Sequence, residues 1–291
     1  MYTRNSNRSL KYLYIDLIGE SKNMDINKLC EFIDTFNNTE TTFVFDYNCL
    51  DYENIKDVID HLVLGFKNFI LKAEKFTQIE KIESLECIID ELRVKIDPVT
   101  GVEKMEQKIT LNTKMFNYIL DLNKNNILKF GVDLYINKNN IYYLREVLKL
   151  LSNNGISSNI LFNEYPANSH YIVQKSNFDV INNNYEIKMI LDNIICDNNL
   201  NIYNKKYVMT MLDTYMNNYC WKKYYPIQAT LSSDFKLKIC NKIDVCIDLD
   251  PLECFENGEL NDEIFKQIKD RCSEYCLGCC CEDFIQEIYG E

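Results

Sequence analysis

The stretch KFGVDLYINKNNIYYLREVLKLLSNNG, residues 129–155, sets the class of fold for this chain. Residues 129–138 are apolar and rich in β-formers, which predicts a buried strand. Residues 139–155 have the pattern of a helix. Gly155 stands where a helix C-cap is needed, because glycine adopts the left-handed backbone conformation without steric cost. A strand followed by a helix is the repeating unit of an α/β protein.

The same alternation extends on both sides of this stretch. Further strands are predicted at 10–18, 41–47, 66–73, 85–96 and 157–166. Helices are predicted between them at 24–37, 51–63, 76–84 and 111–126, with Asp25 as the N-cap of the first and Asn112 or Thr113 as that of the last. Six β-α steps in order predict parallel strands joined by right-handed crossovers. Periodicity alone leaves two forms open, a doubly wound sheet and an incomplete barrel.

The pattern changes after Pro166. Helices are predicted at 185–199 and 204–219, and a last helix at about 260–270. Between them, PIQATL (226–231) and KLKIC (236–240) flank the turn Ser232-Ser233-Asp234, which predicts a β-hairpin. We place a domain boundary near residue 200.

Composition excludes several classes of function. The chain has 291 residues, 46% of them hydrophobic, and a net charge of −12. An acidic chain without a basic patch repels phosphate backbones, so no nucleic-acid partner is expected. No apolar run approaches the roughly 18 residues of a membrane helix. The first residues, MYTRNSNRSLKY, lack the apolar core of a signal peptide, so we expect no membrane association and a cytoplasmic location.

The cysteines predict a metal site. Nine of the thirteen lie between Cys220 and Cys281, and five of these fall within RCSEYCLGCCCEDF (271–284). A reducing cytosol disfavours disulfides, and four thiolates can hold zinc or an iron–sulfur cluster. The predicted ligands are Cys220, Cys240, Cys276 and Cys279, with Cys272 and Cys281 as substitutes. Cys246 and Cys254 follow the hairpin closely. Free thiols remain the alternative.

The other four cysteines, Cys30, Cys49, Cys87 and Cys196, are dispersed in apolar segments. We expect them to act as small core hydrophobes.

The order of these features resembles the radical S-adenosylmethionine (SAM) superfamily with a SPASM or twitch region. VDLYINKNNIYYLREVLKLLSNNG (132–155) looks like the family's fifth strand and helix. CWKKYYPIQATLSSDFKLKIC (220–240) resembles its entry to an auxiliary cluster, and CLGCCCEDF (276–284) is similar to the tail that closes such a region. The resemblance implies a partial (β/α)6 TIM-like barrel over 1–200, and a small C-terminal cysteine-rich α+β module over 201–291 that binds a [4Fe–4S] cluster or zinc.

Two departures from the family define the expected function. Where the family has C-x3-C-x2-C after the first strand, this chain has GESKNMDINKL (19–29), and Cys30 stands alone in a helix. Where the family has a Gly-Gly-Glu-Pro turn that meets the SAM amino group, this chain has FDYNCLDYENI (45–55). SAM binding is therefore not expected.

We expect a degenerate member of the family that keeps an auxiliary cluster. It would be a binding or electron-transfer partner in a peptide or natural-product modification pathway. Its partners would be a peptide substrate or an intact radical SAM enzyme.

Other kinds of chemistry stay open, including whether the chain is an enzyme at all. Cys272, Cys276 and Cys279 have the spacing of a SAM cluster, so the alternative is an active radical SAM enzyme with an atypical cluster site. A purely structural protein without metal is a third reading. Neither His61 nor His170 has a nucleophile beside it. Acidic residues that could line a barrel mouth are Asp90, Glu91, Asp97, Asp133 and Glu164, although charged strand ends facing water explain them more simply.

Overall fold

The protein is described by a computed structural model. It covers residues 10–36, 39–85, 89–96, 102–105, 108–111, 113–124, 129–136, 140–162, 185–205, 208–209, 228–238, 246–247, 250–264 and 266. The chain forms two compact units, each built from separate segments. Unit 1 comprises Met1–Lys72, Gln78–Cys87 and Trp221–Cys279, and unit 2 comprises Ala73–Thr77, Ile88–Cys220 and Cys280–Glu291.

Unit 1 holds the first three predicted strands and the predicted hairpin. Its strands are β1 (Tyr12–Ile15), β2 (Thr42–Phe45), β3 (Asn68–Ala73), β9 (Gln228–Leu231), β10 (Leu237–Lys238), β11 (Cys246–Ile247), β12 (Phe255–Glu256) and β13 (Glu259–Leu260). Its helices are α1 (Ile26–Asp34), α2 (Ile55–Leu64) and α3 (Phe76–Leu85), with 3-10 turns η1 (Cys49–Asp51) and η3 (Pro251–Glu253).

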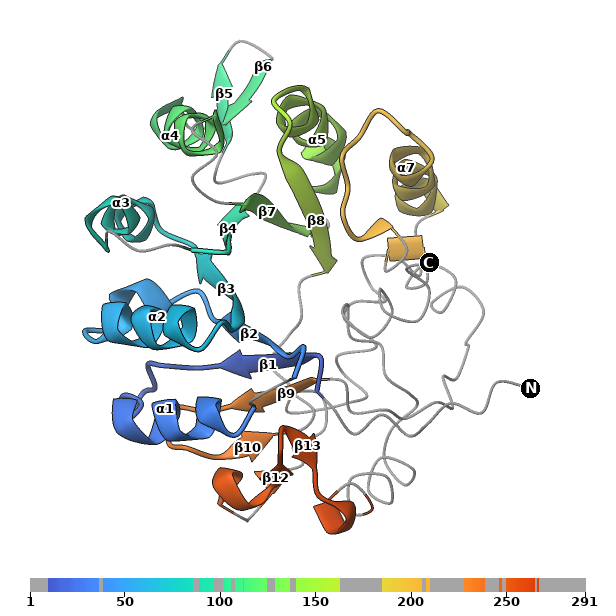
Figure 1. Cartoon of the computed structure of the whole chain (residues 1–291). Coiled ribbons are helices and arrows are strands. Elements are labelled where there is room, and N and C mark those ends of the chain that lie inside the picture. The colour runs from blue at the N-terminus through green and yellow to red at the C-terminus, as the bar shows by residue number, and fades with distance from the viewer. Residues whose placement is uncertain are drawn as a thin grey trace. The chain divides into compact units, whose positions relative to one another are not determined.

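The strands of unit 1 pair in the order β11-β10-β9-β1-β2-β3. The pairs β9–β1, β1–β2 and β2–β3 are parallel, while β9–β10 and β10–β11 are antiparallel. The predicted hairpin is thus confirmed as β9 and β10. Its first strand also lies directly beside the first strand of the chain (Figure 1).

One face of this sheet is covered by α1 and α2 (Figure 1). Because strand side chains alternate between the two faces, Leu13 and Ile15 point to the same side of β1, and both are fully buried. Just after the end of α1, the Phe36 ring packs edge-on against Phe43 of β2, with 5.7 Å between centroids. Phe32, Phe235 and Phe255 extend this aromatic cluster. Burial of apolar side chains on this face therefore holds the helices on the sheet.

Unit 2 holds the other three predicted strands. Its strands are β4 (Glu91–Ile96), β5 (Val102–Met105), β6 (Lys108–Leu111), β7 (Lys129–Ile136) and β8 (Ser157–Phe162). Its helices are α4 (Thr113–Lys124), α5 (Leu144–Asn153) and α7 (Tyr185–Ile195), with the 3-10 turn η2 (Ile141–Tyr143). Strands β4, β7 and β8 pair in parallel, and β5 and β6 form an antiparallel hairpin.

Two helix ends match the sequence signals that predicted them. The Asp25 carboxylate accepts hydrogen bonds from the backbone N–H groups of Asn27 and Lys28, as an N-cap does. At the end of α5, Gly155 has φ +73°. The Gly155 N–H donates to the Ser152 carbonyl, and the next N–H donates to the Leu151 carbonyl, which is a Schellman motif.

The predicted α/β class, with a mostly parallel sheet, is confirmed. Two details differ from the prediction. The strand expected to begin at residue 85 begins at Glu91, because α3 continues to Leu85. The hairpin β5–β6 was not predicted, because each of its strands has only four residues and so gives a short signal. Closure into a partial barrel, the C-terminal module and the boundary near residue 200 remain predictions.

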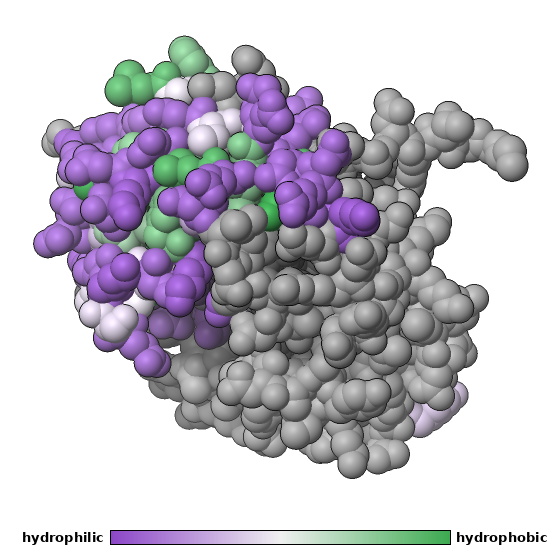
Figure 2. Space-filling view, turned by 90° about the horizontal axis from the view of Figure 1, so that it is seen from below, coloured by the Kyte–Doolittle hydropathy of each residue, from purple (hydrophilic) through white to green (hydrophobic). Residues whose placement is uncertain are grey.

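The surface of the described part is largely hydrophilic on the face shown in Figure 2, with small, separate hydrophobic patches. Among the described residues, no helix combines the length and the apolar character needed to cross a bilayer.

Candidate functional site

The cysteines predicted to bind metal lie outside the described residues. They are Cys220, Cys240, Cys272, Cys276, Cys279 and Cys281. Their role as ligands therefore stays a prediction. Within the described ranges, no three His, Cys, Asp or Glu side chains gather in a way that could hold a metal ion.

The remaining cysteines behave in different ways. Cys49 is buried and its thiol donates to the Lys72 carbonyl oxygen at 3.4 Å, and burial raises its pKa to about 12. Cys254 is also buried, and desolvation followed by the charge of Asp250 raises its pKa to about 11. Both are thiols at neutral pH.

For the dispersed cysteines, the core prediction is only partly right. Cys49 is a core residue, and Cys30 is half-buried. Cys196 is exposed, so the prediction is wrong for it. It directly follows α7, where the helix ends at the surface. Cys87 lies outside the described residues.

The segment after β1, residues 16–24, is a turn closed by backbone hydrogen bonds. The Met24 N–H donates to the Leu17 carbonyl at 2.8 Å, and the Gly19 N–H donates to the Lys22 carbonyl at 3.2 Å. A side chain at Gly19 would collide with the hydroxyl of Ser233 in the β9–β10 turn, so glycine permits the close approach. The segment is thus held by its own backbone and by the hairpin.

The turn after β2 is tied to the turn after β1. The Asn48 side-chain amide donates to the Ile18 carbonyl at 3.2 Å, and the Tyr52 hydroxyl donates to the Met24 carbonyl at 2.7 Å. These two bonds fix the loops that follow neighbouring parallel strands. Sites in α/β proteins gather at this carboxyl edge of the strands.

Charged side chains stand at this edge of unit 1. Asp16 directly follows β1 and Asp46 directly follows β2, and the Asp16 and Asp46 N–H groups continue the strand ladder to the carbonyls of Leu231 and Ile15. Alternation of side chains places both carboxyl groups on the face opposite to the helices. We call the following set the carboxyl-edge site: Tyr14, Asp16, Asp46, Tyr47, Asn48 and Lys72.

In the carboxyl-edge site, neighbouring charges act on the pKa of Asp16 in opposite directions. Desolvation by burial, and then the neighbouring charge of Asp46, raise the pKa of Asp16 to about 6, while Lys238 on β10 acts in the opposite direction. The Lys72 ammonium lies 5.3 Å from the centroid of the Tyr14 ring and 5.2 Å from that of Tyr47. Two carboxyl groups, Asp16 and Asp46, thus share this edge with two cations, Lys72 and Lys238.

Asp16 and Asp46 were not predicted as site residues from the sequence. Each is the first acidic residue after a buried strand, in LYID and FVFD. That signal was available, but only the pairing of β1 with β2 shows that the two carboxyl groups are neighbours.

The acidic residues expected at a barrel mouth lie elsewhere. Asp90 and Glu91 stand at the amino end of β4, the opposite end from the expected mouth. Glu91 makes ion pairs with Arg93 and Lys129, both at 2.7 Å. Asp133 is buried within β7 and accepts a 2.8 Å hydrogen bond from Asn159. Asp97, Glu164 and His170 lie outside the described residues, and the ring of His61 lies 3.0 Å from the Asp34 carboxylate.

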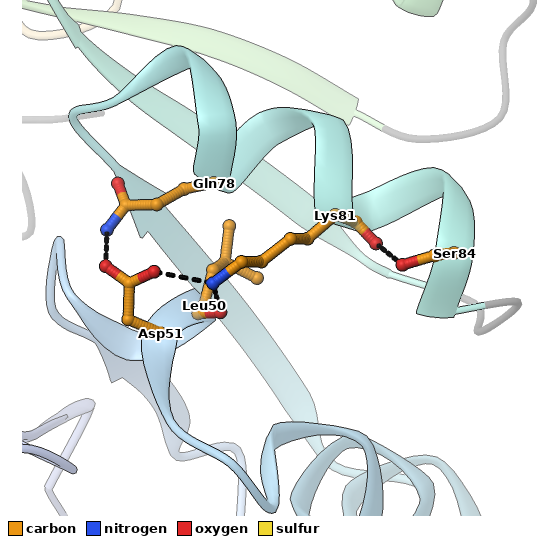
Figure 3. Close-up of polar contacts among 5 residues, drawn as sticks. All are labelled: Leu50, Asp51, Gln78, Lys81 and Ser84. Atoms are coloured by element: carbon orange, nitrogen blue, oxygen red, sulfur yellow. Dashed lines mark hydrogen bonds and ion pairs between the residues drawn. The ribbon is translucent and has the colours of Figure 1, made fainter.

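A second polar cluster in unit 1 is structural. The Asp51 carboxylate of η1 accepts a hydrogen bond from Gln78 at 2.7 Å and pairs with Lys81 at 2.6 Å (Figure 3). Lys81 also donates to the Leu50 carbonyl. These contacts join α3 to the turn after β2.

Comparison with known proteins gives a likeness in fold. No protein-family model and no curated protein matches the chain. Structures of SuiB from Streptococcus suis match 97% of this chain and about three quarters of SuiB. With precursor peptide SuiA bound, SuiB gives a TM-score of 0.58 at 10% identity and 73% coverage of its chain. With S-adenosylmethionine bound, SuiB gives a TM-score of 0.56 at 10% identity and 73% coverage of its chain. A further SuiB structure gives a TM-score of 0.54 at 9% identity and 74% coverage of its chain.

This likeness supports the radical-SAM-like fold expected from the sequence. At 10% identity it concerns the fold alone.

Proposed function

We propose that this chain is a radical-SAM-like protein of a peptide-modification pathway that has lost the SAM-cluster site and acts by binding. The observation that carries the proposal is the likeness to SuiB over 97% of the chain. SuiB has been solved with a precursor peptide and with S-adenosylmethionine. A peptide substrate or a partner radical SAM enzyme is accordingly the proposed binding partner.

The turn after β1 supports the loss of SAM chemistry. An open cluster site needs three thiolates, and no cysteine occurs between Asp16 and Leu29. The turn is closed by its own hydrogen bonds and packed on the β9–β10 turn, so it is a structural element of unit 1. Where the resemblance implies a Gly-Gly-Glu-Pro turn, this chain has Asp46 followed by η1.

The C-terminal cysteines are proposed to keep an auxiliary [4Fe–4S] cluster, or zinc, in a reducing cytoplasm. The proposed ligands are Cys220, Cys240, Cys276 and Cys279, with Cys272 and Cys281 as substitutes. Hydrogen bonding and burial around the thiolates would tune the potential of such a cluster if it passes electrons to a partner.

Metal analysis tests the cluster. The full chain is prepared anaerobically, reconstituted with iron and sulfide, and assayed for iron, sulfide and zinc. We expect about four iron atoms per chain, or one zinc in an unreconstituted sample, with loss of the metal in Cys276→Ala. The exposed Cys196→Ser is the matched control and should retain it. Metal content below one atom per chain in every preparation would contradict the auxiliary site and favour a structural protein without metal.

Peptide binding tests the partner. Short peptides encoded beside the gene are the natural probes, measured by fluorescence anisotropy against the full chain. Saturable binding is expected, and its absence for all such peptides and for an adjacent radical SAM enzyme would contradict the binding role.

The spacing of Cys272, Cys276 and Cys279 favours a second candidate function. In that alternative, the chain is an active radical SAM enzyme whose cluster site lies in the tail.

A further inference from the structure

We propose that the turn between α2 and β3 is a docking surface for a folded partner protein, which offers an apolar pocket bordered by lysine or arginine side chains. The surface consists of Leu64 and Phe66, which we call the apolar tip. The inference rests on the proposed binding role and names the place and the chemistry of the contact.

Both side chains of the apolar tip are exposed. Leu64, the last residue of α2, is 79% exposed, and Phe66 is 95% exposed. The inward face of α2 is complete without them, because it is made by Ile55, Val58, Ile59 and Leu62, all of which are buried. A single apolar residue on a surface needs no explanation, whereas two large ones within three residues indicate an interaction site.

Phe66 has a backbone conformation that favours glycine. Its φ is +53°, in the left-handed region. The Phe66 N–H donates to the Val63 carbonyl at 3.1 Å, and the next N–H donates to the Leu62 carbonyl at 2.9 Å. These bonds form a Schellman motif, in which the left-handed position usually belongs to glycine. The chain has its glycine one residue earlier, at Gly65, where φ is −81°. A bulky side chain therefore stands where the backbone disfavours it.

A second left-handed phenylalanine has a structural reason for its strain. Phe235 has φ +62° in the turn between β9 and β10. Its ring packs edge-on against Phe32 at 6.0 Å, and the Lys28 ammonium lies 5.7 Å from its centroid. The third described non-glycine residue with positive φ is Asn257, a type that tolerates this region. At 95% exposure, Phe66 has no such packing to offset its strain, and uncompensated strain is characteristic of functional sites.

The exposed charges next to the apolar tip are mainly acidic. Asp60 lies one helical turn before Leu64 on α2, and both residues are exposed. Asp34 at the end of α1 has a side chain that is 57% exposed, and its carboxylate lies 3.0 Å from the ring of His61, which is also one turn before the tip. A partner with lysine or arginine around its pocket complements these carboxylates.

The lysines nearby do not reverse this sign. Lys56 lies on α2 one turn before Asp60, so it is two turns away from Leu64. Lys67 directly follows the tip, but its ammonium donates to the carbonyl of Phe36 at 2.9 Å. The exposed charge closest to the apolar tip is therefore negative.

Other occupants fit this surface less well. A net charge of −12 disfavours both a second copy of the chain and an anionic lipid surface. A flexible peptide would need a groove to hold it, whereas the apolar tip consists of two side chains exposed on a turn. A folded pocket can enclose two such side chains and remove them from water, as happens at the centre of protein interfaces.

Photo-crosslinking identifies the partner. A photoreactive benzoyl-phenylalanine is incorporated at position 66 of the full chain, which is irradiated in an extract of its source organism. The same residue at position 189 is the control, because Met189 on α7 is 48% exposed. A protein captured from position 66 is identified by mass spectrometry, produced, and titrated against the purified full chain by isothermal titration calorimetry at low and high NaCl.

Binding and stability should change in opposite directions. Phe66→Gly and Leu64→Ser should each weaken binding at least about tenfold, while Met189→Ser should leave it unchanged. High NaCl should also weaken binding. Phe66→Gly should at the same time raise the midpoint of urea unfolding, because glycine adopts the left-handed conformation without strain. A purely structural Phe66 would give the reverse, an unstable variant with unchanged binding.

The outcomes separate this proposal from the proposed function. The proposal is overturned if position 66 captures no protein, captures only a second copy, or captures a protein that binds Phe66→Gly as tightly as the wild type. It is also overturned if Phe66→Gly abolishes binding to phosphatidylglycerol vesicles in place of a protein. Peptides or a radical SAM enzyme that bind all variants alike would leave the proposed binding role standing without the apolar tip. A captured partner that follows the variant pattern but has no part in peptide modification would support the apolar tip and contradict the proposed pathway.

Discussion

The two compact units place charged side chains on their sheets in different ways. In unit 2, Glu91 pairs with both Arg93 and Lys129, and Asp133 accepts a hydrogen bond from Asn159. In unit 1, the Asp16 and Asp46 carboxylates stand side by side without such partners among the described residues. Paired charges stabilise a fold, whereas unpaired, half-buried charges cost stability and are characteristic of sites that bind ligands.

The comparison predicts opposite signs for neutralising a sheet carboxylate in the two units. Removing a polar group should destabilise unit 2, and neutralising Asp16 should stabilise unit 1. Three variants test this contrast, and a fourth tests the screened ion pair between η1 and α3 in unit 1; all four are ordered here by the size of the expected effect.

Asn204→Ala should have the largest effect. The Asn204 side chain is fully buried, accepts from the Ile160 N–H and donates to the Ile160 carbonyl, both at 2.9 Å. Its loss leaves two backbone groups of β8 unpaired, and the free energy of unfolding should fall by about 3 kcal/mol. Urea unfolding followed by circular dichroism measures the change, with the exposed Asn201→Ala as control. A loss no larger than that of the control would show that the edge of β8 does not depend on this contact.

Glu91→Gln should have the next largest effect on the free energy of unfolding. The Glu91 and Arg93 side chains are each only 12% exposed, so the variant leaves a poorly hydrated guanidinium beside a neutral amide. We expect a loss of about 2 kcal/mol in the free energy of unfolding at pH 7. A variant as stable as the wild type at pH 7 would contradict the claim that paired charges stabilise unit 2.

Asp16→Asn should change stability in the opposite direction. The folded-state pKa of Asp16 is about 6, above its usual 3.8, so folding favours the protonated form. Its stabilising contribution is complete below pH 3.8 and is lost as pH rises through about 6. At pH 8 the variant should therefore be more stable than the wild type by about 1 to 2 kcal/mol, allowing for solvent screening. At pH 3.5 the two proteins should unfold alike.

The same urea titration, repeated across this pH range, checks the sign. A variant less stable than the wild type at pH 8 would mean that the Asp16 carboxylate is satisfied in the folded protein, and the contrast between the units would be lost.

Lys81→Ala should have the smallest effect, because Asp51 then keeps its hydrogen bond from the buried Gln78. The Asp51 and Lys81 side chains are 34% and 47% exposed, so their ion pair is screened by solvent (Figure 3). We expect a loss below about 1 kcal/mol, and high salt should reduce it further. Hydrogen exchange of α3 would report the change locally. A loss as large as that of Asn204→Ala would show that α3 depends mainly on this contact.

The sequence predicts elements well where the signal is local. The strand and helix of residues 129–155 follow from their apolar spacing, and Asp25 and Gly155 mark helix ends because a cap depends on only a few neighbouring residues. The six strands predicted for residues 10–166 are all present in the structure.

The carboxyl-edge site could not be predicted in this way, because it depends on which strands become neighbours. Asp16 and Asp46 become neighbours through the pairing of β1 with β2. Lys238 comes near Asp16 because β10 pairs with β9, and β9 pairs with β1 from far along the chain. Whether a side chain at the end of a helix is exposed also depends on residues far along the chain. For this reason Cys196, which is exposed, was wrongly predicted to be a core residue. The cysteine ligands predicted from spacing stay a prediction.

Cleavage of S-adenosylmethionine tests the central claim most directly. The full chain, reconstituted anaerobically with iron and sulfide, is incubated with SAM and dithionite, and 5′-deoxyadenosine is quantified beside an intact radical SAM enzyme as a positive control. The account predicts no 5′-deoxyadenosine above the protein-free background. Formation of 5′-deoxyadenosine that disappears in Cys276→Ala would contradict it and establish an active cluster in the tail.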